Sequence, residues 1–161
     1  MVMDDSAILA LINDAFGTCP RPEHFTNYRH CEECAEHDAL LRSRDRATLC
    51  GGDLGNPGWD PLCFTSVEGF AYYFPTLARL TLEEPVENHD WLGPSLFFHL
   101  SYAEKGEQNR LIAGFNPKQR HAVLELLKHL EESRTELTDM FLCIDELLVT
   151  IALWSAAVAT N

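Results

Sequence analysis

Apolar residues recur at helical spacing along most of this 161-residue chain, and this periodicity limits the folds that are open to it. The clearest case is "NPKQRHAVLELLKHLEESRTEL", residues 116–137. Asn116 is a preferred helix cap, and Pro117 suits the first helical position. One apolar stripe follows at Val123, Leu126, Leu127, Leu130 and Leu137. The segment predicts a long amphipathic helix.

Three other segments have the same periodicity, a fourth, residues 143–159, is apolar around most of its circumference, and no segment of useful length alternates as a strand does. They cover residues 4–16, 65–84, 93–102 and 143–159. Thr65 precedes Glu68 by three residues, which is the pattern of a capping box, and Pro75 is expected to kink its helix. We predict one all-α domain over residues 1–161, a bundle of about five or six helices with a Gly/Pro-rich loop at residues 50–61.

The charge of the chain excludes one class of ligand. Twelve Lys and Arg against 25 Asp and Glu give a formal net charge of −13. A nucleic-acid binder needs basic side chains to neutralise phosphates, so nucleic acid is not an expected partner. An acidic surface suits a basic protein partner, or serves solubility alone.

Neither end of the chain reads as a targeting or membrane segment. The N-terminal "MVMDDSAILALI" has acids where a signal peptide carries Lys or Arg, and the longest apolar tract, residues 147–159, is shorter than the roughly 20 residues that span a bilayer. We expect no membrane association and a cytoplasmic location. The six cysteines are then expected to be reduced thiols.

The stretch "HCEECAEHD", residues 30–38, gathers two histidines, two cysteines and an aspartate. On a helix over residues 30–41, the cysteines, histidines and Asp38 share one arc with Leu41. The glutamates, Glu32, Glu33 and Glu36, occupy the opposite, solvent-facing side. The cysteines and histidines therefore point inward or into a groove.

This arc suits a zinc site. Cys31 and Cys34 supply thiolates three residues apart, and His30 or His37 adds an imidazole one turn away. One straight helix cannot surround a tetrahedral ion, so a fourth ligand has to come from elsewhere, such as His24, Cys50 or Cys63. The paired CxxC or HxxxH knuckles of common zinc modules are absent.

Two other interpretations of the same stretch stay open. In a redox pair, Cys31 near a helix N-terminus has a lowered pKa and attacks disulfides, and Cys34 resolves. Such pairs typically follow a strand, and no strand is predicted here. In the third interpretation the arc is simply the helix interior, where cysteine packs as a small hydrophobe and each histidine needs a partner such as Asp38.

Three motifs together resemble a known family. "HCEEC" near residue 30, "SVEGFAYYFPTLARLTL" near 66 and "FNPKQRHAVLELLKHL" near 115 are similar to successive landmarks of an uncharacterised bacterial family classed as a domain of unknown function. The resemblance covers most of the chain. It implies no activity, ligand or catalytic residue.

The sequence favours a binding role over catalysis. No GxSxG, GxxxxGK[ST], GxGxxG or HExxH pattern occurs. We expect an acidic protein-interaction or antagonist-type domain without catalytic activity and with no cofactor. The sequence does not predict its oligomeric state. The alternative is a zinc-binding protein with its site on the helix at residues 30–38, formed by His30, Cys31, Cys34 and His37.

Overall fold

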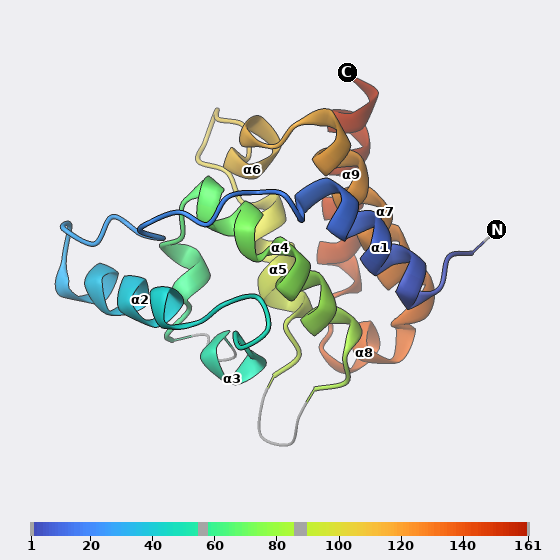
Figure 1. Cartoon of the computed structure of the whole chain (residues 1–161). Coiled ribbons are helices and arrows are strands. Elements are labelled where there is room, and N and C mark those ends of the chain that lie inside the picture. The colour runs from blue at the N-terminus through green and yellow to red at the C-terminus, as the bar shows by residue number, and fades with distance from the viewer. Residues whose placement is uncertain (1, 55–57, 86–89, 161) are drawn as a thin grey trace. The chain divides into compact units, whose positions relative to one another are not determined.

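The computed structural model describes residues 2–54, 58–85 and 90–160 (Figure 1). These residues are 66% helical, and the only strand-like pairing among them is an isolated bridge between Thr26 and Thr65. The all-α prediction is confirmed. The chain forms two compact units, one of residues 1–15 and 93–161 and one of residues 16–92. The single-domain prediction for residues 1–161 stays a prediction.

The described residues hold nine α-helices. The first unit contains α1 (Asp5–Phe16, apart from its last residue), α5 (Gly93–Ser101), α6 (Arg110–Gly114), α7 (Pro117–Ser133), α8 (Thr135–Met140) and α9 (Ile144–Ala159). The second contains α2 (Glu32–Ser43), α3 (Gly51–Leu54), the 3-10 helix η1 (Pro61–Cys63) and α4 (Val67–Leu82).

The prediction of five or six helices was wrong in number. Six of the nine have seven or more residues. The other three, α3, α6 and α8, have four to six residues, which is too short for an apolar stripe to repeat. The Gly/Pro-rich segment 50–61 is accordingly not all turn, because it contains α3; its residues 55–57 lie outside the described residues.

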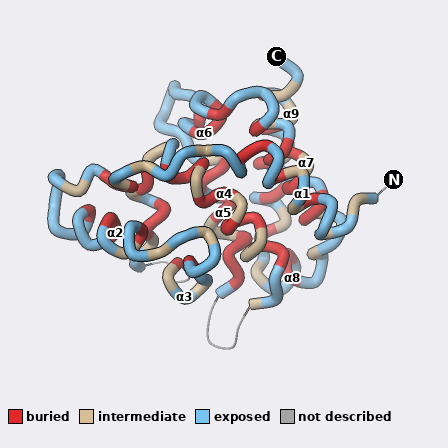
Figure 2. Tube along the Cα trace, viewed as in Figure 1, coloured by how far each residue is buried: buried red, intermediate tan, exposed pale blue. Residues whose placement is uncertain are grey.

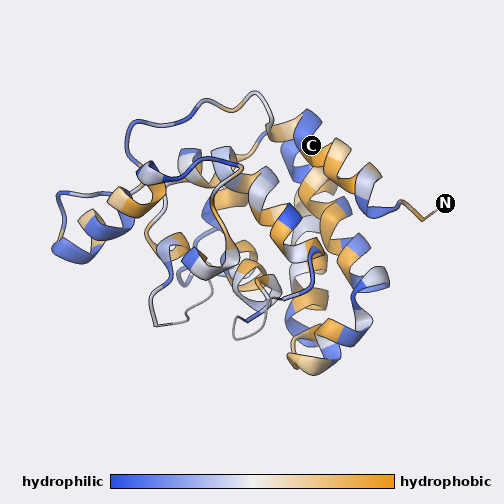
Figure 3. Cartoon of the chain, turned by 60° about the horizontal axis from the view of Figure 1, so that its bottom comes forward, coloured by the Kyte–Doolittle hydropathy of each residue, from blue (hydrophilic) through white to orange (hydrophobic). Residues whose placement is uncertain are grey.

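The core of the first unit lies where α9 packs against α7 and α5. The predicted stripe is fully buried from Val123 to Leu130 on α7, but the helix predicted over residues 116–137 ends at Ser133, and Leu137 lies in α8. Asn116 caps α7, as predicted, and its capping box with Gln119 was not predicted. Trp154 of α9 is buried, and its indole N–H donates to the carbonyl of Leu100 over 2.8 Å. Figure 2 shows the buried residues of the chain in red, and Figure 3 shows hydrophobic and hydrophilic residues alternating along the helices.

The second unit is built on α4. The Tyr73 hydroxyl donates to the carbonyl of Leu41 at the end of α2, over 2.6 Å, and the rings of Phe16 and Phe74 stack with centroids 4.5 Å apart. The helix runs through Pro75 without ending. These contacts hold α2 and Phe16 against α4.

The capping prediction for α4 was wrong by one residue. Ser66 is the cap, and its hydroxyl accepts the N–H of Gly69 over 3.1 Å. The Thr65 hydroxyl instead donates to the carbonyl of Pro61 and is buried. Thr65 therefore belongs to the segment that precedes the helix, where its hydroxyl bonds to the first residue of η1.

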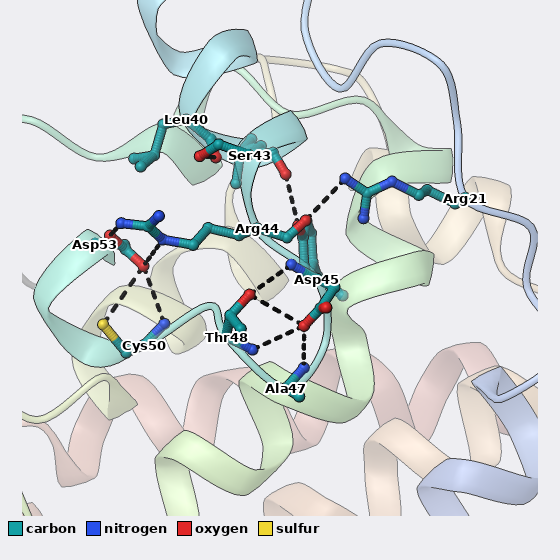
Figure 4. Close-up of polar contacts among 11 residues, drawn as sticks. Arg21, Leu40, Ser43, Arg44, Asp45, Ala47, Thr48, Cys50 and Asp53 are labelled. Atoms are coloured by element: carbon teal, nitrogen blue, oxygen red, sulfur yellow. Dashed lines mark hydrogen bonds and ion pairs between the residues drawn. The ribbon is translucent and has the colours of Figure 1, made fainter.

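The connector between α2 and α3 is rigidly tied (Figure 4). The Asp45 carboxylate accepts the backbone N–H groups of Ala47 and Thr48, each over 2.9 Å. Arg44 forms two 3.1 Å bonds to Asp53. Arg21 donates to the carbonyls of Arg42 and Arg44, each over 2.8 Å, which satisfies the C-terminal end of α2. The C-terminal end of α2 is thereby fixed within the second unit.

Candidate metal centre

Cys31 caps α2 and is not part of it. The helix begins at Glu32, and Cys31 has extended backbone angles of φ −161° and ψ 171°. Its sulfur accepts the N–H of Cys34 over 3.4 Å, the role that a Ser or Asp oxygen usually has. The predicted helix over residues 30–38 therefore began two residues too early, because an extended residue at 31 ends the helical geometry.

Because the helix begins only after Cys31, His30 lies close to the two cysteines. A turn over residues 27–30, closed by the His30 N–H bond to the Asn27 carbonyl, points the imidazole back toward the helix. His30 Nδ1 lies 3.7 Å from Cys34 Sγ, and the two sulfur atoms are 3.2 Å apart. One ligand atom from each of these three residues lies within 4.8 Å of the others.

The two thiols have opposite electrostatic environments. The hydrogen bond from the Cys34 N–H lowers the pKa of the Cys31 thiol, and the Cys34 side chain and His30 add to this effect. The hydrogen bond with Cys31 raises the pKa of the Cys34 thiol, and desolvation acts in the same direction. Cys31 is exposed, whereas Cys34 is 5% exposed.

His37, the fourth predicted ligand, is not a member of this group among the described residues. Its ring is completely buried, stacked on Phe64 with centroids 4.8 Å apart and 4.4 Å from the Trp59 ring. Neither ring nitrogen has a hydrogen-bond partner in the described part of the chain. Glu33 Oε1 is 3.6 Å from Nε2, too far for a hydrogen bond.

Asp38 is the anchor of the loop that carries His30. Its carboxylate accepts the backbone N–H groups of Phe25 and Thr26 over 2.6 and 3.1 Å, and it pairs with His24 Nδ1 over 2.7 Å. Burial alone would raise the pKa of Asp38, but these hydrogen bonds outweigh it and hold the pKa below its ordinary value. The Thr26 hydroxyl adds a 2.6 Å bond to the carbonyl of Cys34. Segment 24–26 is thus fastened to α2.

The three proposed fourth ligands lie outside the group. His24 pairs with Asp38 and stacks on Tyr28, with ring centroids 3.8 Å apart. Cys50 lies against the carboxylate of Asp53, and Cys63 lies 3.7 Å from that of Asp60. Asp38, the partner expected for a buried histidine, serves His24 and not His37. Sequence spacing gave no signal for these loop contacts.

Acidic side chains surround the group on its exposed side. Glu32, Glu33 and Glu36 are exposed, as predicted, and they line a shallow hollow together with Cys31, Gly58 and Trp59. Their negative charge favours accumulation of cations near the two thiols.

Comparisons with known proteins add no relative: no family model, curated protein or solved structure matches the chain. Within the described residues, none of the helices combines the length and the apolar character that crossing a bilayer requires.

Proposed function

We propose that the protein binds a zinc-class transition-metal ion through His30, Cys31 and Cys34. The observation that carries the proposal is the clustering of two sulfur atoms and one imidazole nitrogen within 4.8 Å of one another. Thiolate and imidazole are the ligands that zinc takes in proteins, and hard ions such as Mg²⁺ and Ca²⁺ prefer oxygen.

The separations in the cluster suit a tetrahedral ion. Bonds of about 2.3 Å to sulfur and about 2.05 Å to nitrogen require S···S and S···N separations of about 3.8 and 3.6 Å. The corresponding distances are 3.2 Å between the sulfurs and 3.7 Å between Cys34 Sγ and His30 Nδ1. A small rotation of the exposed Cys31 side chain accommodates the difference of about 0.6 Å between the sulfurs.

The exposure of the cluster favours an accessible ion. His30 and Cys31 are exposed, so three protein ligands on one side leave a coordination position for water or another donor. The lowered pKa of Cys31 makes a thiolate ligand available at lower pH than an ordinary cysteine does, and metal binding requires the thiolate.

Cobalt titration tests the proposal, because thiolate ligation gives Co²⁺ an intense charge-transfer absorption. The wild-type protein is expected to develop this absorption up to one equivalent of Co²⁺ and to lose it when zinc is added. Cys31→Ser and Cys34→Ser should each lose most of the intensity. Cys50→Ser is the matched control, since Cys50 is exposed and outside the group, and it should titrate like wild type. Equal spectra for all four proteins would refute the proposal.

A second candidate function is the binding of a basic protein partner, and the exposed side of α9 favours it. Exposed apolar side chains follow one another on and just before this helix, at Met140, Leu142, Leu148, Val149 and Leu153. Asp145 and Glu146 lie beside them and are exposed. Apolar side chains next to acids suit an apolar partner surface with basic residues around it.

Salt dependence tests this second function. Capture of a partner should weaken steeply between about 0.05 and 0.5 M salt, because exposed charges are screened within about 10 Å at 0.1 M. Val149→Lys should abolish the capture and Glu104→Lys, on an exposed loop residue, should reduce it less. A partner retained equally at both salt concentrations would remove charge as the cause.

A further inference from the structure

The two sulfur atoms at the start of α2 are close enough for a second kind of chemistry. They lie 3.2 Å apart, and a disulfide bond is about 2.05 Å long, so bond formation needs an approach of about 1.2 Å. Cys31 is exposed and precedes the helix, whereas Cys34 is 5% exposed in the first turn. A solute can therefore reach the Cys31 sulfur, whereas the Cys34 sulfur is buried.

The local backbone permits this closure without a preceding strand. Cys31 is extended, and its sulfur contacts the Cys34 N–H over 3.4 Å and the Cys34 sulfur over 3.2 Å. Rotation of this one exposed side chain brings the sulfurs together and leaves α2 intact. The other exposed cysteines differ, because the sulfurs of Cys50 and Cys63 lie 3.4 and 3.7 Å from the carboxylates of Asp53 and Asp60.

We propose that Cys31 and Cys34 form a reversible dithiol–disulfide couple that exchanges with low-molecular-weight disulfides, with Cys31 attacking and Cys34 resolving. The proposal goes beyond metal binding and does not depend on it. The same sulfur atoms cannot bind a metal as thiolates and be joined in a disulfide, so the two states of the site exclude each other.

With oxidised glutathione the exchange has two steps. The Cys31 thiolate attacks one sulfur of glutathione disulfide, a mixed disulfide forms, and the first glutathione leaves as a thiolate that takes a proton from water. Cys34 then loses its proton to solvent and attacks Cys31 Sγ, and the second glutathione leaves. Two protein thiols are oxidised to one disulfide, and one glutathione disulfide is reduced to two thiols.

A tryptic peptide reports on this pair alone. Cleavage after Arg29 and Arg42 releases residues 30–42, which contain Cys31 and Cys34 and no other cysteine. Chelator-treated folded protein is incubated with millimolar oxidised and reduced glutathione, quenched with an alkylating agent, digested and weighed by mass spectrometry. Chelation removes any metal first, so the result does not depend on whether the zinc proposal holds.

The expected product is the peptide lacking two hydrogens, about tenfold or more in excess over its glutathione adduct, because the second attack is intramolecular. Cys34→Ser should trap the adduct on Cys31, and Cys50→Ser should behave as wild type. Wild-type peptide recovered mainly as the adduct, or unmodified while the peptide of residues 47–79, which holds both Cys50 and Cys63, is modified, would overturn the proposal. So would Cys31→Ser forming an adduct on Cys34 as readily as Cys34→Ser forms one on Cys31.

Discussion

Replacing Asp38 by alanine should be one of the most destabilising single changes in the second unit. The side chain is 4% exposed and accepts two backbone N–H groups in addition to its bond with His24. Each buried N–H left without a partner costs about 1–3 kcal/mol, and the lost His24 bond adds about 1 kcal/mol. We expect Asp38→Ala to lower the free energy of unfolding by about 3–7 kcal/mol.

Two matched variants separate this mechanism from general damage. Asp38→Asn keeps an oxygen for the two N–H groups and removes only the charge, so it should lose about 1–2 kcal/mol. Asp14→Ala removes an aspartate whose ion pair with Lys118 is largely exposed, and it should change little. Urea unfolding followed by far-ultraviolet circular dichroism measures all three. A loss below about 1 kcal/mol for Asp38→Ala would refute the reasoning.

Acid should reduce the advantage of the wild type over Asp38→Asn. The pKa of Asp38 is lower in the folded chain than in the unfolded chain, so the unfolded chain binds more protons as the pH falls. The contribution is complete above the ordinary aspartate pKa of about 3.9 and is lost as the pH falls through the lower folded value. The stability difference between the two proteins should therefore shrink below about pH 4, and a difference independent of pH would contradict this sign.

Three further changes follow from buried contacts. Gly69→Ala should lower the free energy of unfolding by about 1–3 kcal/mol, because its Cβ would lie 2.9 Å from side-chain carbons of Phe25 and Thr65. Gly51→Ala, whose Cβ would have nothing within 4 Å, should not lower it. Equal melting temperatures of the two variants would argue against this packing. His37→Phe should raise the free energy of unfolding by about 1 kcal/mol and leave cobalt binding unchanged, and loss of cobalt would return His37 to the ligand set. Burial raises the pKa of the Cys143 thiol, and Glu146 adds to this effect. An alkylating agent should therefore modify Cys143 only after urea unfolds the protein, whereas the exposed Cys50 reacts in the folded protein. Comparable alkylation rates of the two cysteines in the folded protein would contradict this.

The sequence allowed the long helices to be predicted because their caps and stripes are local. Asn116 and Pro117 mark the start of α7, and the buried apolar residues of this helix lie within a few turns of each other. The short helices have too few turns to show a period. The choice of Ser66 over Thr65 as cap depends on η1, because the Thr65 hydroxyl donates to the carbonyl of Pro61 in η1. No local pattern distinguishes these neighbouring hydroxyls.

The candidate site was predictable in composition and less so in geometry. The alternation of inward Cys34 and Asp38 with outward glutamates is a helical pattern and was read correctly from residues 32–38. The start of the helix after Cys31 was not predicted, since cysteine is not a usual N-terminal cap. The position of His37 depends on Trp59 and Phe64, more than 20 residues away, and spacing within one segment carries no information about such contacts.

Zinc stoichiometry tests the central claim most directly. Protein purified without chelator is analysed for zinc by elemental analysis, with its melting temperature measured before and after chelation. We predict close to one equivalent of zinc, a melting temperature that falls when the metal is removed, and loss of both effects in the Cys31→Ser, Cys34→Ser double variant but not in Cys50→Ser. Less than about a tenth of an equivalent of zinc, with a melting temperature that added zinc does not change, would contradict a metal centre at His30, Cys31 and Cys34.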